Sequence, residues 1–137
     1  MDYYQSTKRG RVIIKTFNKS AKAQFYIARI GQVGKPMWAP YTANNSFMVI
    51  SDNPESDFQK VKAAYESGAF NYYALGSCQP SIRISDVRDV VEKSQGIAEK
   101  HLLKLAAIEK YISAQQEVLN KQKQLLVDMQ RSVFLGA

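Results

Sequence analysis

The sequence is poor in the residues from which catalytic and metal sites are usually built. Among 137 residues it has one cysteine, Cys78, and one histidine, His101. A zinc site needs three or four such ligands, and a nucleophilic triad needs a base and a third group that orients it. Gly31 and Gly34 lack the Lys-Ser/Thr or the helix start that completes a phosphate-binding loop. We therefore expect a protein that is not an enzyme and that uses no metal or cofactor.

Features of secreted and membrane proteins are also missing. The lone Cys78 excludes an internal disulfide, which is typical of a reducing compartment. The first residues, MDYYQSTKRGR, contain no apolar stretch of the kind found in a signal peptide. No apolar run approaches the ~18 residues of a membrane span. These absences favour a cytoplasmic protein, or a nuclear one in a eukaryote, without a membrane partner.

Acidic residues are nearly absent from the first third of the chain. Residues 1–51 contain one acid, Asp2, and eight basic residues, so their net charge of +7 equals that of the whole chain. Residues 52–137 hold eleven basic and eleven acidic side chains, which cancel. Eight of the fifteen aromatic residues lie in the same basic segment. Cations interleaved with aromatic rings suit a nucleic-acid partner, because cations contact phosphates and rings stack on bases.

This pattern defines the residues that we expect to contact nucleic acid. They are Lys8, Arg9, Arg11, Lys15, Lys19, Lys22, Arg29, Lys35, Tyr26, Trp38 and Tyr41. Other interpretations fit parts of the set. The basic run at residues 8–11 also suits a solvated tail, and lysines on strands also protect a sheet edge from pairing. Trp38, which lies between prolines, suits a core position as well as a stacking platform.

Local patterns predict the elements of the first part of the chain. β-branched and aromatic residues over 11–17, 22–30 and 46–50 predict strands, the first two joined as a hairpin through Asn18-Lys19-Ser20. Residues 37–41 suit an edge strand because prolines bracket them. Further strands are expected at 70–75 and 81–84. Asp52-Asn53-Pro54 predicts the start of a short helix that stops at Gly68.

The last third of the chain carries a heptad pattern. From Ser85 onward there is no proline, and an apolar residue recurs at every seventh position from Val91 to Val133. This spacing predicts a long amphipathic helix. A continuous helix over 85–135 would be ~75 Å long, so it has to break, most readily at Gly96, or find a partner helix. We expect a homodimer or higher oligomer held by Leu105, Ile108, Ile112, Leu119, Leu126, Met129 and Val133.

Together these patterns predict an α+β fold. A small antiparallel sheet of about four to five strands with one short helix would precede a long C-terminal amphipathic helix. The expected division is a basic β-rich domain over 1–84 and a helical segment over 85–137 for packing and oligomerisation. This layout resembles that of the Whirly single-strand binders, which assemble through helices, although no motif residue carries over.

Two functions fit the sequence. The first is a non-enzymatic nucleic-acid-binding protein, for single-stranded DNA or RNA, that oligomerises as a coiled coil. The second is a phage or mobile-element factor that binds and inhibits, or scaffolds, an acidic host protein. Small basic chains with a single cysteine are common among such factors. A salt-dependent gel shift with generic oligonucleotides distinguishes the two.

Overall fold

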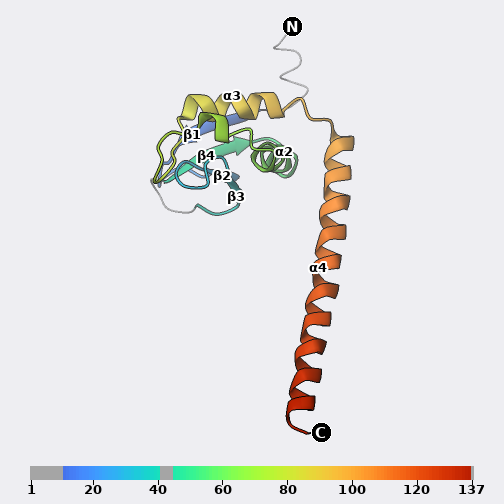
Figure 1. Cartoon of the computed structure of the whole chain (residues 1–137). Helices are drawn as coiled ribbons and strands as arrows, with labels where there is room; N and C mark the ends of the chain where they lie inside the picture. Colours follow the sequence, from blue (N-terminus) through green and yellow to red (C-terminus); the bar gives the residue numbers. More distant parts are fainter. Residues whose placement is uncertain (1–10, 41–44, 137) are drawn as a thin grey trace. The chain divides into compact units, whose positions relative to one another are not determined.

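The computed structural model describes residues 11–40 and 45–136. Its strands are β1 (Val12–Thr16), β2 (Phe25–Ala28), β3 (Pro36–Met37) and β4 (Ser46–Ser51). Its helices are α2 (Pro54–Glu66), α3 (Ile84–Ser94) and α4 (Glu99–Phe134), with a 3-10 turn, η2 (Asn71–Tyr73), between α2 and α3 (Figure 1). The chain divides into two compact units, Met1–Ala98 and Glu99–Ala137. The predicted α+β class is confirmed.

The four strands form one antiparallel sheet in the order β1-β4-β2-β3. β4 pairs with both β1 and β2, and Val49 lies opposite Ile14 on one side and Phe25 on the other. The predicted hairpin of the first two strands is therefore wrong, because β4 lies between them. β4 is buried along nearly its whole length, as its unbroken apolar run Phe47–Ile50 requires of a central strand.

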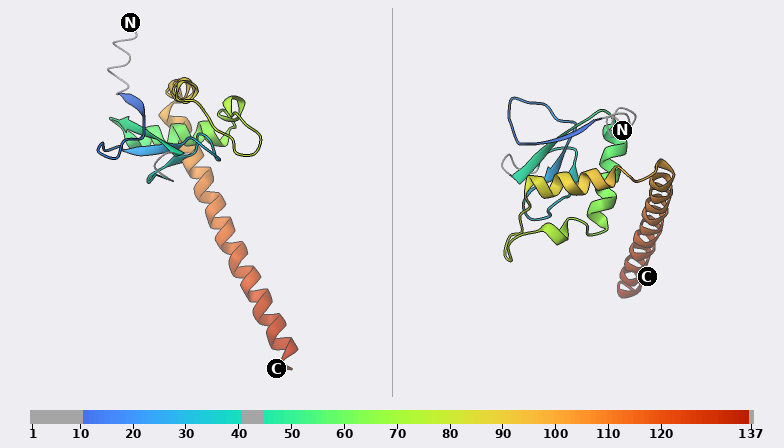
Figure 2. Two further views of the ribbon diagram at one scale, coloured as in Figure 1. Left: turned by 90° about the vertical axis from the view of Figure 1, so that its left-hand side faces the viewer. Right: turned by 90° about the horizontal axis from the view of Figure 1, so that it is seen from above.

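The core lies on one face of the sheet, under α2 and α3. Strand residues at alternate positions, such as Ile14, Ile27 and Val49, point to this face and are almost fully buried. Phe58 and Val61 of α2, and Val87, Val90 and Val91 of α3, join them in a single cluster. The two helices cross each other in this layer (Figure 2). One face of the sheet thus packs against α2 and α3, and the other face points away from these helices.

The connection from α2 to α3 differs from the prediction. Residues 70–75 do not form a strand, because Asn71–Tyr73 make a 3-10 turn and only Leu75 forms an isolated bridge, with Ser81. Phe70 is fully buried and anchors the turn in the core, whereas Tyr72 is 87% exposed. Ser81 also bridges to Ile30, so the expected strand at 81–84 is reduced to these bridges. Burial of Phe70, rather than strand pairing, fixes this segment.

Gly34 is required by the close approach of Phe70. Its φ is +86°, and a Cβ added there would lie 2.1 Å from Cγ of Phe70. Gly31 has a similar φ of +78° but has nothing within 4 Å of an added Cβ. It is therefore a matched control for backbone strain alone. In a left-handed conformation a side chain costs about 1–2 kcal/mol, and forced overpacking costs about 1–3 kcal/mol more.

We expect Gly34→Ala to lower the free energy of unfolding by about 2–5 kcal/mol. Gly31→Ala should lower it by only about 1–2 kcal/mol, because strain is its only cost. Urea unfolding of the two variants beside the wild type measures both values. Equal losses for the two variants would contradict the packing of Phe70 on Gly34.

The helical third of the chain breaks where the sequence predicted. α3 ends at Ser94 and α4 begins at Glu99, so Gly96 lies in the connection. α3 belongs to the first unit through its buried valines, which moves the division of the chain from the expected 84/85 to 98/99. Val91 consequently packs in the core and is not part of the stripe on α4. Within residues 11–40 and 45–136, no helix combines the length and the apolar character needed to cross a membrane.

Candidate nucleic-acid interface

The sheet face opposite α2 and α3, which we call the outer face, has a basic and aromatic middle row. The strand register places Lys15, Met48, Tyr26 and Met37 side by side across all four strands. Lys15 is exposed and Tyr26 is half-buried. Alternation puts these residues on the outer face, since their neighbours Ile14, Val49, Phe25 and Pro36 are buried on the other side.

The connection between β1 and β2, residues 17–24, lies on the same outer face. β1 and β2 both run antiparallel to β4 and hence parallel to each other, so the connection has to return along the sheet. The backbone N–H of Asn18 donates to Sδ of Met48 at 3.1 Å, and the rings of Phe17 and Tyr26 lie 6.3 Å apart. Met48 is only 1% exposed as a result.

This connection adds two cations to the outer face. Lys19 and Lys22 are both exposed within it. The turn that carries Lys19 is held by Asn18, whose Oδ1 accepts hydrogen bonds from the backbone N–H and Oγ of Ser20 at 3.0 and 2.7 Å. The expected Asn18-Lys19-Ser20 turn is therefore present, although it opens a crossover connection and not a hairpin.

Arg11 and Lys35 extend the row of cations at two sheet edges. The carbonyl of Arg11 accepts from the N–H of Asp52, and that of Lys35 accepts from the N–H of Ala28, so both continue the strand ladders. By alternation Arg11 lies on the face of Ile13 and Lys15, and Lys35 on the face of Met37. Nζ of Lys35 lies 3.4 Å from Oε1 of Gln32.

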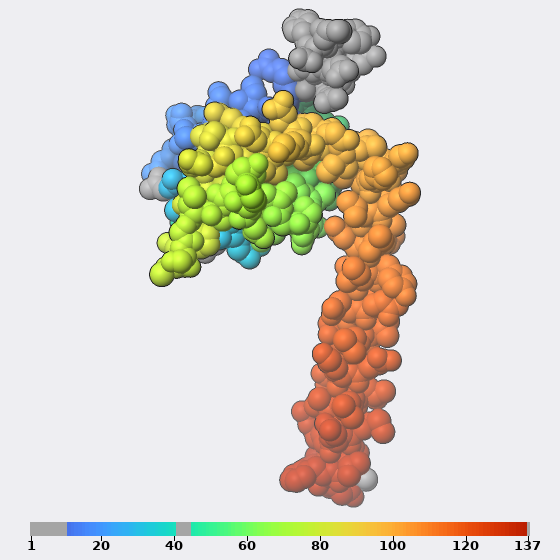
Figure 3. Space-filling view, turned by 45° about the horizontal axis from the view of Figure 1, so that its top comes forward, coloured from blue at the N-terminus to red at the C-terminus, as the bar shows by residue number. Residues whose placement is uncertain are grey.

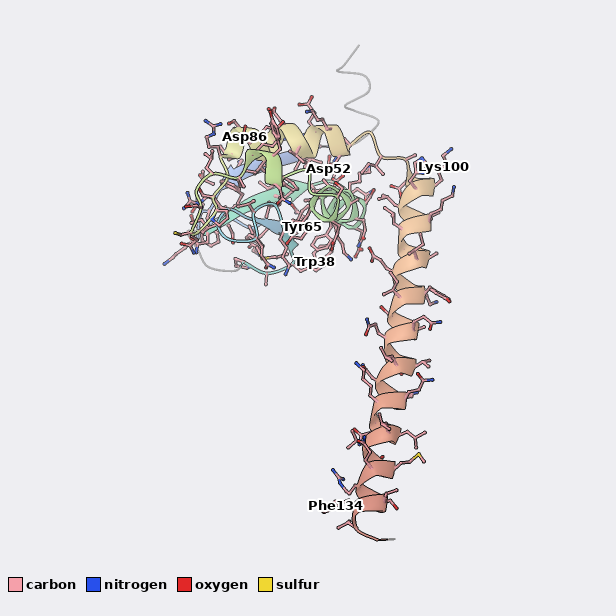
Figure 4. All side chains as sticks on the ribbon, in the orientation of Figure 1. Trp38, Asp52, Tyr65, Asp86, Lys100 and Phe134 are labelled. Carbon is pink, nitrogen blue, oxygen red and sulfur yellow. The ribbon has the colours of Figure 1, made fainter. Side chains whose placement is uncertain are left out.

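Other residues of the predicted set lie elsewhere. Arg29 follows Phe25 and Ile27 in alternation, which places it toward the helix side, where its carbonyl accepts from the N–H of Ile82. Trp38, which Figure 4 labels, stacks on Phe58 of α2. The ring centroids are 4.1 Å apart and the ring planes are 8° apart. Trp38 is nevertheless 51% exposed, so it covers the core at its edge. Lys8, Arg9 and Tyr41 lie outside the described residues.

Charge separates the sheet from its helix layer. Residues 11–51 contain six basic side chains and no acidic one, whereas residues 52–98 contain five basic and seven acidic side chains. Asp52 lies at the margin of the sheet, where its Oδ2 accepts from the backbone N–H of Arg11 at 2.9 Å. A positive field over the outer face follows, because exposed charges act over ~8 Å at physiological salt.

The buried polar side chains of the first unit form hydrogen bonds that connect its strands and helices. Asp57, in the first turn of α2, is 3% exposed and accepts from Oγ of Ser51 and from Nε2 of Gln95, the latter at 3.2 Å. It thereby links the ends of β4, α2 and α3. Arg88 of α3 donates through Nη2 to the carbonyl of Ile14 at 2.8 Å and covers the edge strand β1. In the described part of the chain, no three His, Cys, Asp or Glu side chains gather as a metal site would require.

α4 carries the expected oligomerisation residues on its surface. All seven are exposed, from 43% at Leu105 to 77% at Val133. The helix is a continuous rod of side chains (Figure 3). Its 36 residues correspond to ~54 Å. A further apolar row, Tyr111, Val118 and Leu125, flanks this stripe at the same sevenfold spacing, as the heptad pattern indicates, and is exposed as well.

Comparison with known proteins identifies one matching protein family. No curated protein and no solved structure matches the chain. The model of one protein family, described as a family of unknown function (DUF6943), matches residues 14–135. The match spans most of β1, the rest of the sheet, the helix layer and all of α4, so the family model covers both units. The chain is therefore a member of the DUF6943 family.

Proposed function

We propose that this protein is a non-enzymatic nucleic-acid-binding protein that holds single-stranded DNA or RNA on the outer face of its sheet. One observation carries the proposal. Five cations from separate parts of the chain gather on that face: Arg11, Lys15, Lys19, Lys22 and Lys35. The residues 11–51 that supply them contain no acid to neutralise them.

The outer face suits a flexible polyanion. Its lysines and arginine contact phosphates and release counterions, which supplies affinity without sequence preference. Tyr26 offers an aromatic ring in the same row as Lys15, with Met48 of β4 between them, and stacking of a base on such a ring adds affinity that tolerates sequence. Single strands expose their bases for this contact, so Tyr26 favours a single-stranded ligand. The two contacts predict distinct responses to mutation.

Removal of outer-face cations should weaken binding, while removal of helix-layer cations should not. We expect Lys15→Ala, Lys19→Ala and Lys22→Ala combined to reduce the affinity for a single-stranded oligonucleotide at least about tenfold at ~50 mM salt. The matched control combines Lys60→Ala, Lys62→Ala and Lys93→Ala, which removes the same charge from α2 and α3. Fluorescence anisotropy of a labelled oligonucleotide measures both. Equal weakening in the two variants would exclude a localised site.

Tyr26 should contribute to oligonucleotide binding by stacking its ring on a base. Tyr26→Leu is expected to cost about 1–3 kcal/mol of binding free energy with little change in salt dependence, whereas Tyr26→Phe retains the ring and the affinity. Trp38→Leu should instead lower the stability, because Trp38 stacks on Phe58. The same anisotropy assay, together with thermal unfolding, measures these effects. A larger binding loss for Trp38→Leu than for Tyr26→Leu would move the proposed contact to the edge of the helix layer.

A second candidate function rests on the apolar part of the outer face. Ile13 and Ile50 lie opposite each other there, and both are half-buried, as is Met37. Apolar residues among cations also suit a protein partner with an acidic rim. A phage or mobile-element factor that binds and inhibits or scaffolds a host protein would use this face in the same way. Absence of oligonucleotide binding at ~50 mM salt would make this the leading function.

Self-association through α4 completes the proposal. A helix of this length with an exposed apolar stripe gains by burying it against another helix, at about 25 cal/mol for each Å² of apolar surface removed from water. Two or more copies would join several weak nucleic-acid sites in one assembly and raise the avidity for a long strand.

A further inference from the structure

A second aromatic ring, that of Phe17, lies beside Tyr26 on the outer face. Phe17 is the first residue after β1 and continues the alternation of Ile13 and Lys15, which lie on that face. Its ring centroid is 6.3 Å from that of Tyr26, and the two ring planes are inclined by 33°. Both residues are half-buried, so part of each stays accessible to a ligand. Phe17 is not among the contact residues that the sequence pattern predicted.

The backbone on both sides of Phe17 is fixed to the central strand β4. On one side Thr16 still belongs to β1 and pairs with β4. On the other side the N–H of Asn18 donates to Sδ of Met48 at 3.1 Å, and Met48 itself lies opposite Tyr26 in the strand register. The positions of the two rings are therefore set by the same strand.

The spacing of these two rings differs from that of the ring pairs in the core. Trp38 and Phe58 lie face to face with centroids 4.1 Å apart, and Phe25 meets Phe58 edge to face at 5.3 Å. Among the ring contacts of the described residues, that of Phe17 with Tyr26 has the widest separation. Carbon atoms in contact lie ~3.5 Å apart, so a base between two rings needs centroids ~7 Å apart. The pair has to open by less than ~1 Å, and rotation about χ2 turns the two rings parallel at little cost.

Cations flank Phe17 in the sequence. Lys15 precedes it by two residues and Lys19 follows it by two, and both lysines are exposed. A base between the rings has a phosphate on each side along its own strand, and these two cations are placed to contact them. Residues 11–51 contain no acid that would repel the phosphates. The ring pair and its lysines thus fit an unpaired base with its flanking phosphates.

We propose that Phe17 and Tyr26 together hold one unpaired base between their rings. This inference rests on the nucleic-acid binding of the proposed function and adds a second ring to the contact made by Tyr26. A base in a duplex is paired and stacked on its neighbours, so it has to be flipped out before it can enter. The ring pair therefore selects single strands over duplexes, whereas the lysines contact the phosphates of both.

A double-mutant cycle tests whether the two rings hold the same base. Phe17→Leu and Tyr26→Leu each remove a ring and keep an apolar side chain. In the full-length protein each is expected to weaken binding of a labelled oligothymidine about five- to hundredfold. Because the two rings share one base, the double variant should be weakened by clearly less than the product of the two single losses.

Two control variants accompany the cycle. Phe17→Tyr keeps the ring and should keep the affinity of the wild type. Tyr72→Leu removes a ring that is 87% exposed in the connection from α2 to α3, away from the outer face, and should leave the affinity unchanged. Thermal unfolding of Phe17→Leu checks that the fold is retained.

Two further ligands separate ring contacts from charge contacts. A duplex of the same length and inorganic polyphosphate both offer phosphates without unpaired bases. Phe17→Leu should change the affinity for either ligand by less than about twofold, since it removes no cation. A single-stranded oligonucleotide that contains 5-iodouracil gives a readout that needs no variant. On irradiation it should cross-link to Phe17 or Tyr26 of the wild type, as mapped by peptide mass.

The results distinguish failure of this inference from failure of the proposed function. A loss of single-strand affinity in Phe17→Leu, with a smaller than multiplied loss in the double variant, supports the shared base. Unchanged affinity in Phe17→Leu, losses that multiply, an equal loss for polyphosphate, or cross-links only at other residues overturn the shared base while nucleic-acid binding stands. Absence of oligonucleotide binding by the wild type overturns the proposed function itself.

Discussion

A fragment of residues 1–84 should fail to fold, whereas a fragment of residues 1–98 should fold with one cooperative transition. The core cluster ends at Val91, and α3 supplies three of its members: Val87, Val90 and Val91. Burial of a valine side chain is worth about 1.5–3 kcal/mol, so the loss of all three costs about 5–9 kcal/mol. This loss is comparable to the total stability of a small domain, about 5–15 kcal/mol.

Thermal unfolding followed by circular dichroism distinguishes the two fragments. Fragment 1–98 retains every buried residue of the core cluster, together with Gln95, which donates to Asp57. It is therefore the control for fragment 1–84. A soluble 1–84 fragment with a cooperative transition would contradict the role assigned to α3. Loss of folding in fragment 1–98 would show that α4 is needed for the stability of the first unit.

Two aspartates on the stripe of α4 should convert the oligomer to a monomer. Leu105→Asp with Ile112→Asp places two charges in the apolar face, and burying an unpaired charge costs several kcal/mol. The matched control is Ala106→Asp with Ser113→Asp, one residue further along. It adds the same two aspartates on the opposite side of the helix. The control should keep the oligomeric mass of the wild type.

Sedimentation velocity at micromolar concentration measures all three proteins. The wild type and the control should sediment as a dimer or larger species, and the stripe variant as a 15.5 kDa monomer. Helical content measured in parallel checks that α4 is still formed in the variant. A monomeric wild type would contradict self-association. A dimeric stripe variant would show that the dimer interface does not include Leu105 and Ile112.

The sequence predicted the elements better than their arrangement. Strands near 12–16, 25–28 and 46–51, the helix that begins at Pro54 and the break near Gly96 follow from local chemistry and are confirmed. Pairing depends on which strand is buried on both faces, and nearness in the chain suggested a hairpin instead. The unbroken apolar run Phe47–Ile50, compared with β1, which ends in the polar residues Lys15 and Thr16, was the signal that β4 is central.

Only part of the candidate interface could be predicted from the sequence. Alternation alone placed Lys15 on the face opposite Ile14, as the structure has it. It could not show that the connection with Lys19 and Lys22 returns over the outer face, because that depends on the insertion of β4 between β1 and β2. Trp38 was assigned to both a stacking platform and a core position. Its partner Phe58 lies twenty residues away on α2, a distance that local patterns do not span.

The salt dependence of oligonucleotide binding tests the central proposal most directly. For a single strand the slope of log Kobs against log salt is about −0.7 for each phosphate contact. Full-length protein with five outer-face cations should therefore show a slope of about −3.5 between ~50 and ~200 mM salt. Removal of Lys15, Lys19 and Lys22 should reduce it to about −1.4. Absence of binding at ~50 mM salt, or a slope that this triple variant leaves unchanged, would contradict nucleic-acid binding by the outer face.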